Sequence, residues 1–214
     1  MDNTGNIKII DLDLNREISE DLNQITNDEN IRVVILGFTD EFDFIKENDF
    51  EESLIEQIKH FPIPVICKIK NQAKDFLFEI VLASHICIAT ESAEFEIADG
   101  KKLKKQIGAK NLEKLNSIEN RINAKTALDL GIINKITTAE NLEKKSFEMA
   151  EQISKLAPIA IGYCLKAVNQ GSEINMKDGL KLETELFSRI FATEDMKEGT
   201  SAFLEKREPK FNGK

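Results

Sequence analysis

Short apolar runs punctuate the first half of the chain and give the first indication of its fold. Four of these runs are rich in β-branched residues, and stretches with helical periodicity separate them. Strands buried on both faces have continuous apolar sequences, and alternation of strand with helix favours right-handed crossovers and parallel pairing. The pattern therefore predicts an α/β core with a largely parallel sheet, with strands at residues 7–14, 31–38, 65–69 and 86–89.

From about residue 110 onward the pattern is almost wholly helical. One helix face is indicated by the spacing of Leu142, Met149, Ile153 and Leu156. Thr138 is suited to cap the start of this helix, and Pro158 prevents it from continuing unbroken. Further helices are expected after Pro158, over residues 180–191, and after Thr193, where two acidic residues follow a capping residue. With no internal repeat or long linker, a single domain is predicted.

The segment Asn71 to His85 is predicted to form a buried helix, because its apolar residues leave no obvious solvent face. Glu79 interrupts this apolar sequence near the start of the helix. A glutamate is seldom buried unless it is paired or used, because removing its charge from water is costly. Two hypotheses follow for Glu79: a general acid or base beside free helix N–H groups, or a structural carboxylate in an ion pair or at a wet edge.

Charge and cysteine content narrow the function classes. The 214 residues carry a formal net charge of -9, which disfavours general binding to nucleic acids. The three cysteines, Cys67, Cys87 and Cys164, are widely spaced in apolar stretches, so buried reduced thiols are expected rather than disulfides or a metal site. The chain lacks an apolar run of membrane-spanning length and a basic, apolar leader, which predicts a cytoplasmic protein that does not enter a membrane.

Three segments of the chain carry a family resemblance: PVICKIKNQAKDFLFEIVLASHICIATESAEFEI, INAKTALDLGIINKI and the C-terminal ELFSRIFATEDMKEGTSAFLEKREPKF. They resemble segments of the crotonase superfamily, the family of enoyl-CoA hydratases and isomerases. In that family a buried strand precedes an asparagine-glycine turn, a run of glycines and a cysteine-glutamate-leucine helix. The resemblance implies a crotonase-like β-β-α spiral core over residues 1–140. It implies that residues 141–214 form a C-terminal helical trimerisation region of the same domain.

The resemblance also assigns candidate catalytic carboxylates. Glu79 falls on the first catalytic glutamate of hydratases and Asp99 on the second, with aspartate in place of glutamate. In hydratases this pair holds and activates a water. Asp99 has a shorter side chain, and its Ala-Asp-Gly context is equally typical of a turn.

The family's oxyanion hole is made of two backbone N–H groups, which the resemblance places at Phe38 and Phe76. Neither position lies in the glycine-rich sequence typical of the family: the chain reads FTDEFDF after Gly37, and Asp75, Phe76 and Leu77 occupy the place of the glycine run. Any residue except proline offers an N–H, but a bulky side chain at Phe76 is expected to crowd the approach of an acyl chain.

Lysines provide weak candidates for binding coenzyme A. Lys101 and Lys102 belong to a basic cluster shortly after Asp99, and the resemblance adds Lys206 and Lys210 near the C-terminus. A solvated surface loop is the competing hypothesis for the cluster. No metal site is predicted, because His60 and His85 lack metal-ligand spacing.

Two functional hypotheses remain. In the first, the protein is a hydratase- or isomerase-type enzyme acting on a coenzyme A or carrier-protein thioester, with Glu79 as acid or base, and with coenzyme A as substrate carrier rather than bound cofactor. In the second, it is a noncatalytic scaffold or binding partner whose active site has degenerated. Both predict a homotrimer or a dimer of trimers.

Overall fold

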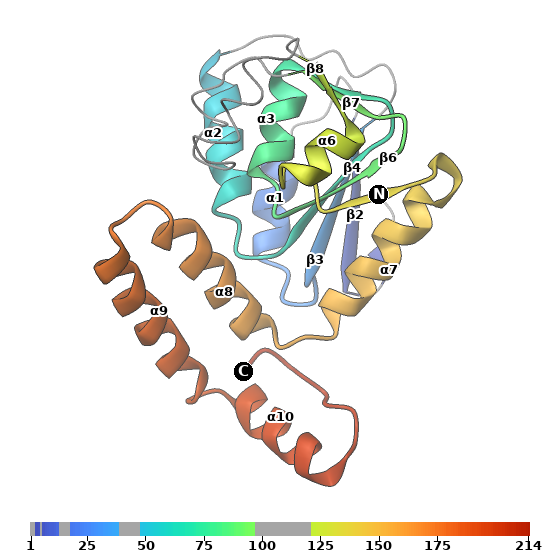
Figure 1. The fold of residues 1–214 in the computed structure, drawn as a ribbon. Helices are drawn as coiled ribbons and strands as arrows, with labels where there is room; N and C mark the ends of the chain where they lie inside the picture. Colours follow the sequence, from blue (N-terminus) through green and yellow to red (C-terminus); the bar gives the residue numbers. More distant parts are fainter. Residues whose placement is uncertain (1–2, 5, 13–17, 39–47, 97–120) are drawn as a thin grey trace.

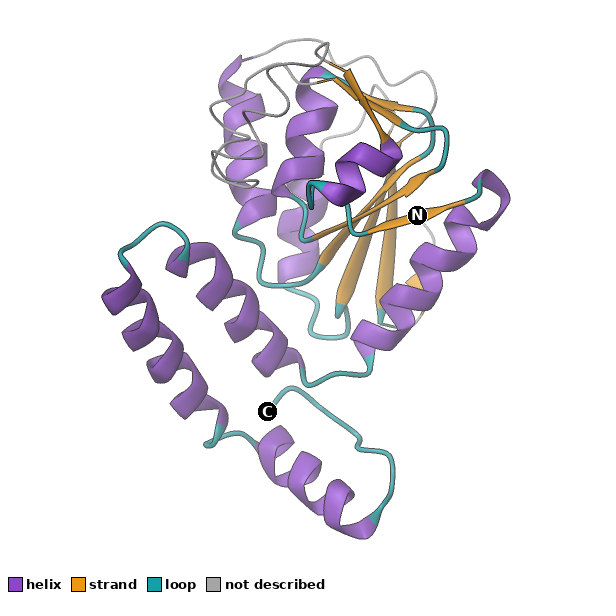
Figure 2. Ribbon diagram, in the orientation of Figure 1, coloured by secondary structure: helices purple, strands orange, loops and turns teal. Residues whose placement is uncertain are grey.

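A six-stranded sheet forms the centre of the molecule in the computed structural model, which describes residues 3–4, 6–12, 18–38, 48–96 and 121–214 (Figures 1 and 2). The strand order is β1-β2-β3-β4-β6-β9. All neighbouring strands are parallel except β1, which is antiparallel to β2. The strands are β1 (Asn3–Thr4), β2 (Ile7–Leu12), β3 (Val33–Phe38), β4 (Val65–Ile69), β6 (Ile86–Thr90) and β9 (Lys135–Thr137).

A smaller, three-stranded sheet lies beside the first. It has the order β5-β7-β8, with β5 parallel to β7 and β7 antiparallel to β8. Its strands are β5 (Gln72–Ala73), β7 (Glu94–Glu96) and β8 (Arg121–Asn123). Apolar residues of both sheets join one core cluster, in which Phe95 of β7 and Ile122 of β8 pack with Cys67 and Ile69 of β4. The shared cluster fixes the small sheet against the large one.

Helices cover both faces of the six-stranded sheet (Figure 1). Side chains alternate along a strand, so Val34 and Leu36 of β3 pack with α1, α2 and α3, whereas Val33 and Ile35 pack with α7. This two-sided burial explains why β3 has a continuous apolar sequence. The helices of the core are α1 (Ile18–Thr26), α2 (Asn48–Lys59), α3 (Asp75–Ala83), α6 (Ala124–Asp129) and α7 (Leu142–Ser154), the last preceded by the 3-10 turn Ala139–Asn141.

Gly37 of β3 lies beside the buried side chain of Lys68, which forms ion pairs with two exposed carboxylates on the α7 side of the sheet. Lys68 of β4 is 6% exposed, and its Nζ lies 2.6 Å from Glu143 Oε2 and 3.6 Å from Asp11 Oδ1. A Cβ at position 37 would lie 3.0 Å from Lys68 Cε and closer still to Asp11 Oδ1, so a side chain there would displace both groups. The ion pair with Glu143 ties the first turn of α7 to the sheet.

Three further helices form an arm that extends away from the core: α8 (Pro158–Gly171), α9 (Met176–Ile190) and α10 (Glu194–Glu205) (Figure 1). Among the described residues, the exposed large apolar side chains are concentrated here. All but Leu128 lie at or beyond residue 156, and they include Phe187, Phe191 and Phe203, which are 60%, 55% and 82% exposed. Such a concentration of exposed apolar surface is typical of a protein contact.

The α/β core and the mainly helical C-terminal part agree with the sequence-based prediction. The predicted strand at residues 65–69 is found unchanged. The strand predicted at 31–38 begins two residues later, and that predicted at 86–89 ends one residue later. Residues 13–14 of the strand predicted at 7–14 lie outside the described residues. Since α7 packs on the six-stranded sheet, the arm itself begins at α8, and the division of the chain at residue 140 stays a prediction.

Several local predictions were wrong. Thr138 precedes the 3-10 turn rather than α7, which begins after Asn141, and Leu156 lies beyond the end of α7 and is exposed. The segment after residue 110 contains β8 and β9, which are too short to produce a clear alternation. Cys164 is exposed on α8, although Cys67 and Cys87 are buried as expected.

The C-terminal tail folds back on the start of α10. Thr193 caps this helix as predicted, its Oγ1 accepting a hydrogen bond from Met196 N. Asp195 is only 2% exposed, and its carboxylate accepts hydrogen bonds from Asn212 N at 2.7 Å and Gly213 N at 2.9 Å. The carbonyl oxygen of Lys214 in turn accepts a hydrogen bond from Glu194 N at 2.6 Å. Asp195 is therefore the point at which the tail is fastened to the arm.

We predict that Asp195→Ala lowers the free energy of unfolding by about 1–3 kcal/mol, because it leaves two N–H groups of the tail without their acceptor. Urea denaturation measures this change. The matched control is Asp178→Ala, which removes an exposed first-turn acid from α9 and is expected to lower the free energy of unfolding much less. Equal losses in the two variants would contradict the proposed fastening.

His85, between α3 and β6, joins the helix to the neighbouring strand β4. Its Nδ1 accepts a hydrogen bond from Val65 N at 3.0 Å, whereas its Nε2 is buried without a partner among the described residues. Burial lowers the pKa of His85 to about 4 against a smaller opposing effect of the Lys59 carbonyl. Because Nδ1 must be unprotonated to accept this bond, the neutral imidazole is the form that the fold requires.

The free energy of unfolding should therefore decrease as the pH decreases. An unfolded chain takes up the His85 proton near pH 6.5 and the folded chain only near pH 4, so stability is lost as the pH falls from about 7 to 4. The loss from this group is at most about 3 kcal/mol. His85→Asn keeps an acceptor for Val65 N but cannot titrate, so its urea midpoint should change less between pH 7 and 5. Parallel pH curves for the two proteins would refute this role.

Candidate functional site at the carboxyl edge of the sheet

The structure brings three of the predicted site residues to the carboxyl edge of the parallel sheet. Phe38 is the last residue of β3. The pairing of β3 with β4 ends at Leu36, so Phe38 lies beyond the part of β3 that pairs with β4. Phe76 and Glu79 lie in α3, which begins just after β4 and the short strand β5. In open α/β sheets, ligands bind at this edge, outside the carboxyl ends of the strands.

Phe38 and Phe76 share one apolar cluster, although 38 positions separate them in sequence. Phe76 is a buried member of the cluster formed with α1 and α2, and the half-buried Phe38 packs against the same cluster. The expectation that the Phe76 side chain crowds the approach to α3 stays a prediction. The structure shows this side chain buried in the core cluster.

Packing on two sides of α3 determines where Glu79 lies. Phe76 and Ile80 belong to the cluster beneath α1 and α2. Phe78 and Val81 belong to the cluster between the sheets, where the Phe78 ring meets that of Phe95 edge to face at 6.4 Å between centroids. Glu79 is half-buried between these two apolar faces. A carboxylate in such a place is partly shielded from water, which suits proton transfer.

The first turn of α3 presents backbone N–H groups at the same edge. The first hydrogen bonds of the helix run from Leu77 N and Phe78 N to the Lys74 carbonyl, at 3.0 and 3.4 Å. The N–H of Phe76 precedes them, so the helix itself supplies no carbonyl for it. Helix N-termini stabilise negative charge, which is the property an oxyanion site needs.

The remaining predicted site residues either lie outside the described residues or lie at the C-terminal end of the chain. Asp99, Lys101 and Lys102 lie outside the described residues. Lys206 follows α10 as its C-cap, Lys210 lies in the tail, and both are exposed. Figure 1 shows α10 far from α3 in the same chain. Contact of either lysine with a ligand at α3 would therefore require the arm of a second chain.

Thiol and metal chemistry gain no support in the described part of the chain. Cys67 and Cys87 pair in register across β4 and β6, and a hydrogen bond from the Cys87 thiol to Cys67 together with burial raises the pKa of Cys87, which keeps the thiol protonated. The described residues contain no group of three or more His, Cys, Asp or Glu side chains that would hold a metal ion. Nor does any described helix combine the length and the apolar character needed to span a bilayer.

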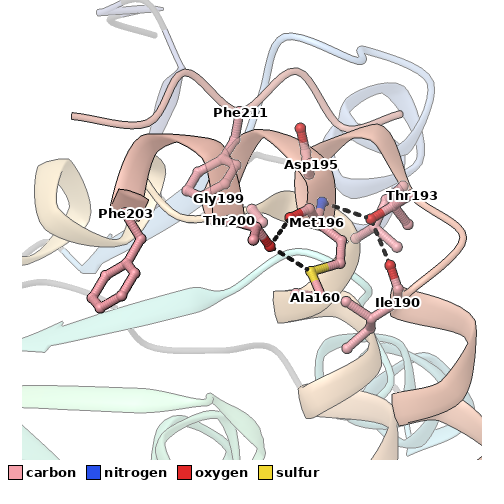
Figure 3. A pocket seen from close by; sticks show the side chains of 11 residues that line it. Ala160, Ile190, Thr193, Asp195, Met196, Gly199, Thr200, Phe203 and Phe211 are labelled. Atoms are coloured by element: carbon pink, nitrogen blue, oxygen red, sulfur yellow. Dashed lines mark hydrogen bonds between the residues drawn. The ribbon is translucent and has the colours of Figure 1, made fainter. Parts of the chain in front are cut away.

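A hollow of about 400 Å³ lies in the arm where α8, the end of α9 and α10 meet (Figure 3). Its walls are mainly apolar, and its hydroxyls are used internally: Thr200 donates to the Met196 carbonyl, and Thr193 donates to the Ile190 carbonyl. Its one carboxylate, Asp195, is held by the tail. The hollow therefore suits apolar packing rather than acid-base chemistry.

Sequence reasoning missed one unusual feature of the site, the backbone of Asp75. This residue, the first of α3, has φ 48°, in the left-handed region that glycine favours. The available signal was its place in the segment where the crotonase resemblance expects glycines. Glycines at that place indicate a backbone that needs positive φ, and aspartate is among the few other residues that tolerate it.

Comparison with known proteins gives a consistent picture. A family model described as enoyl-CoA hydratase/isomerase matches residues 2–214. A probable enoyl-CoA hydratase of Bacillus subtilis is 31% identical over 228 residues, which cover 92% of this chain and 88% of that protein. A probable mitochondrial enoyl-CoA hydratase 2 of Arabidopsis thaliana is 31% identical over 167 residues. That second match covers 73% of this chain but only 56% of the plant protein.

A solved structure agrees over nearly the whole chain. The crystal structure of an enoyl-CoA hydratase from Bacillus anthracis superposes with a TM-score of 0.86 at 26% sequence identity. The match covers 99% of this chain and 97% of the other. The arm and the core are therefore both part of the shared architecture.

Proposed function

Because the chain belongs to the enoyl-CoA hydratase/isomerase family, we propose that it is a lyase- or isomerase-type enzyme that acts on an acyl thioester. The thioester is carried by coenzyme A or by a carrier protein. The reaction is acid-base chemistry at the carbons next to the thioester carbonyl. Coenzyme A enters as part of the substrate, and the scheme includes no bound cofactor.

The observation that carries this proposal is the position of Glu79. Glu79 is half-buried on α3, one turn beyond the N-terminal turn of that helix. Its neighbours on α3 pack into the core on two sides. A carboxylate and helix N–H groups at one edge can act on the two ends of a thioester that lies across them. The Phe76 ring is buried in the core cluster beneath α1 and α2.

In the proposed reaction, the N–H groups of Phe38 and Phe76 hold the thioester oxygen while Glu79 moves a proton. For a 2-enoyl thioester, water oxygen bonds to Cβ, Glu79 takes a proton from the water, and Cα receives one, so that the elements of water add across the double bond. For a 3-enoyl thioester, Glu79 takes a proton from Cα and returns one to Cγ. Asp99 is the proposed second carboxylate.

A noncatalytic scaffold is the alternative function. It is favoured by the absence of the glycine run at positions 75–77 and by the apolar surface of the arm. In either case we propose that the arms assemble the chain into a trimer or a dimer of trimers, with a cytoplasmic location. In the enzyme, such assembly would also offer a route by which Lys206 and Lys210 reach the site of a neighbouring chain.

Turnover of 2-enoyl and 3-enoyl coenzyme A thioesters tests the enzyme proposal. Glu79→Gln should lower kcat by about 100-fold or more, because proton transfer by a positioned side chain contributes about 10²–10⁴-fold. The preferred thioester distinguishes hydration from isomerisation. Hydration is measured as the loss of the conjugated enoyl absorbance, and isomerisation as its appearance.

Glu151→Gln is the matched control, since it makes the same change at an exposed position of α7 and should leave turnover unaltered. Absence of turnover in the wild-type protein, or equal rates in wild type and Glu79→Gln, would favour the scaffold instead.

Assembly is tested at the aromatic pair of α9. The rings of Phe187 and Phe191 meet edge to face at 5.2 Å between centroids and are largely exposed in the single chain. Phe187→Asp should convert the assembly to monomers at micromolar concentration, because a charge cannot be buried unpaired in an apolar interface. Light scattering after gel filtration measures the mass. A wild-type monomer, or a variant that still assembles, would rule out this interface.

A further inference from the structure

Arg32, just before β3, joins the core to the arm through its guanidinium. Its Nη1 donates a hydrogen bond to the Ser154 carbonyl at 3.1 Å, and its Nη2 donates one to the Phe211 carbonyl at 2.6 Å. These acceptors lie 122 and 179 positions away in the sequence. The Arg32 backbone is itself fixed in the core, because its N–H donates to the Asn6 carbonyl at 2.8 Å. One side chain therefore connects the sheet, the end of α7 and the C-terminal tail.

Ser154 lies at the joint between the core and the arm. It is the last residue of α7, which packs on the sheet, and residues 155–157 connect it to the start of α8 at Pro158 (Figure 1). A carbonyl in the last turn of a helix lacks an intrahelical partner and lies at the negative end of the helix dipole, where a cation is favoured. The guanidinium of Arg32 therefore binds the chain at the point where it leaves the core.

Phe211 carries the connection on to α10. The Phe211 ring lies against Gly199 of that helix, where an added Cβ would be 3.4 Å from the ring (Figure 3). The next two residues, Asn212 and Gly213, donate hydrogen bonds to Asp195 at the start of the same helix. The tail and α10 thus form one unit, and Arg32 holds that unit to the core.

A cleft of about 780 Å³ lies between α8 and the core, with Phe61 on the core side and Ile159 on the helix side. At the far end of α8 a second link joins the two parts, because Lys59 forms an ion pair with Glu173 and its carbonyl accepts a hydrogen bond from Asn169. The ion pair is exposed, so solvent weakens it. The bonds of Arg32 are partly buried and have a charged donor, which makes them stronger. Loss of Arg32 would leave α8 attached at its far end, about which the arm could turn.

We propose that Arg32 is a positioning residue that fixes the angle between the core and the arm, and that this angle sets how tightly the arm binds a second copy of the chain. The surface that would bind the second copy carries the exposed side chains of Phe187, Phe191 and Phe203. A mobile arm must be ordered when it binds, and this ordering lowers the affinity, whereas an arm already held in place avoids the loss. The part of the inference that concerns assembly rests on the proposed function.

Double electron–electron resonance between two spin labels measures the angle directly. Cys164 is exposed on α8 whereas Cys67 and Cys87 are buried, so Cys164 takes a label selectively. Gln24→Cys places the second label at an exposed position of α1, and co-assembly with an excess of unlabelled protein keeps the measured distances within one chain. The distance distribution should be narrow with Arg32 present and broader or displaced in Arg32→Ala. Arg32→Lys keeps the charge without the planar fork, so its distribution should lie between the two.

Light scattering over a range of concentrations measures assembly of the unlabelled proteins. Arg32→Ala should raise the dissociation constant about tenfold or more, because it removes two hydrogen bonds of a charged donor. The matched control is Arg121→Ala, which removes an exposed arginine of the small sheet that pairs with Glu96. It should change neither the distance distribution nor the dissociation constant.

An unchanged distance distribution in Arg32→Ala would overturn the inference. A broader distribution with an unaltered dissociation constant would also overturn it, since the angle would then not govern assembly. Circular dichroism checks folding, and if Arg32→Ala does not fold, the distribution of Arg32→Lys decides in its place. Failure of the proposed function is distinct: absent turnover leaves both measurements as they are, and a monomeric wild-type protein refutes the role in assembly while the distances still show whether Arg32 fixes the arm.

Discussion

The packing of α3 between two apolar clusters is the constraint on which the rest of the site depends. The helix is too apolar to lie on a surface, and it buries side chains both beneath α1 and α2 and between the two sheets. Because it starts at the carboxyl edge of β4, this burial fixes its first turn beside the end of β3. Glu79 is the polar residue left between the buried faces. Its place on the helix follows from the burial of its neighbours.

Much of the core could be predicted from the sequence, because strands buried on two sides leave an unambiguous apolar signal. The run at Val65–Ile69 is the clearest case, and the apolar sequence around Glu79 likewise predicted a buried helix. Short strands were less accessible: Gln72–Ala73 makes only two pairs with β7, too few to generate a periodic pattern. The crotonase resemblance, which the comparisons confirm, supplied the fold and the site that periodicity alone could not give.

Features that depend on the conformation of one residue were beyond sequence reasoning. The two acids after Thr193 lie in the first turn of α10 as predicted. No pattern in the sequence indicated that Asp195 also accepts hydrogen bonds from the tail, 17 and 18 positions away. The positive φ of Asp75 was likewise hidden, since aspartate is compatible with several backbone conformations. The burial of the Phe76 side chain likewise depends on the way α3 packs.

The site and the arm differ in how far one chain completes them. The described part of the site has its carboxylate and its helix N-terminus within a single chain, whereas the arm exposes phenylalanines that a neighbouring surface would cover. A protein that lost catalysis could keep the arm unchanged, since the arm does not supply Glu79 or Phe76. Conservation of the family architecture over the whole chain is therefore compatible with either function, and the chemistry must be judged at α3.

A crystal structure of the protein with an inert analogue of a 2-enoyl coenzyme A thioester would test most directly whether the first turn of α3 and Glu79 form one site. We expect the thioester oxygen to lie about 3 Å from the Phe76 nitrogen, with Glu79 beside the carbons that react. An analogue bound elsewhere, or a thioester oxygen that faces away from the first turn of α3, would contradict the central claim that this turn and Glu79 form one site.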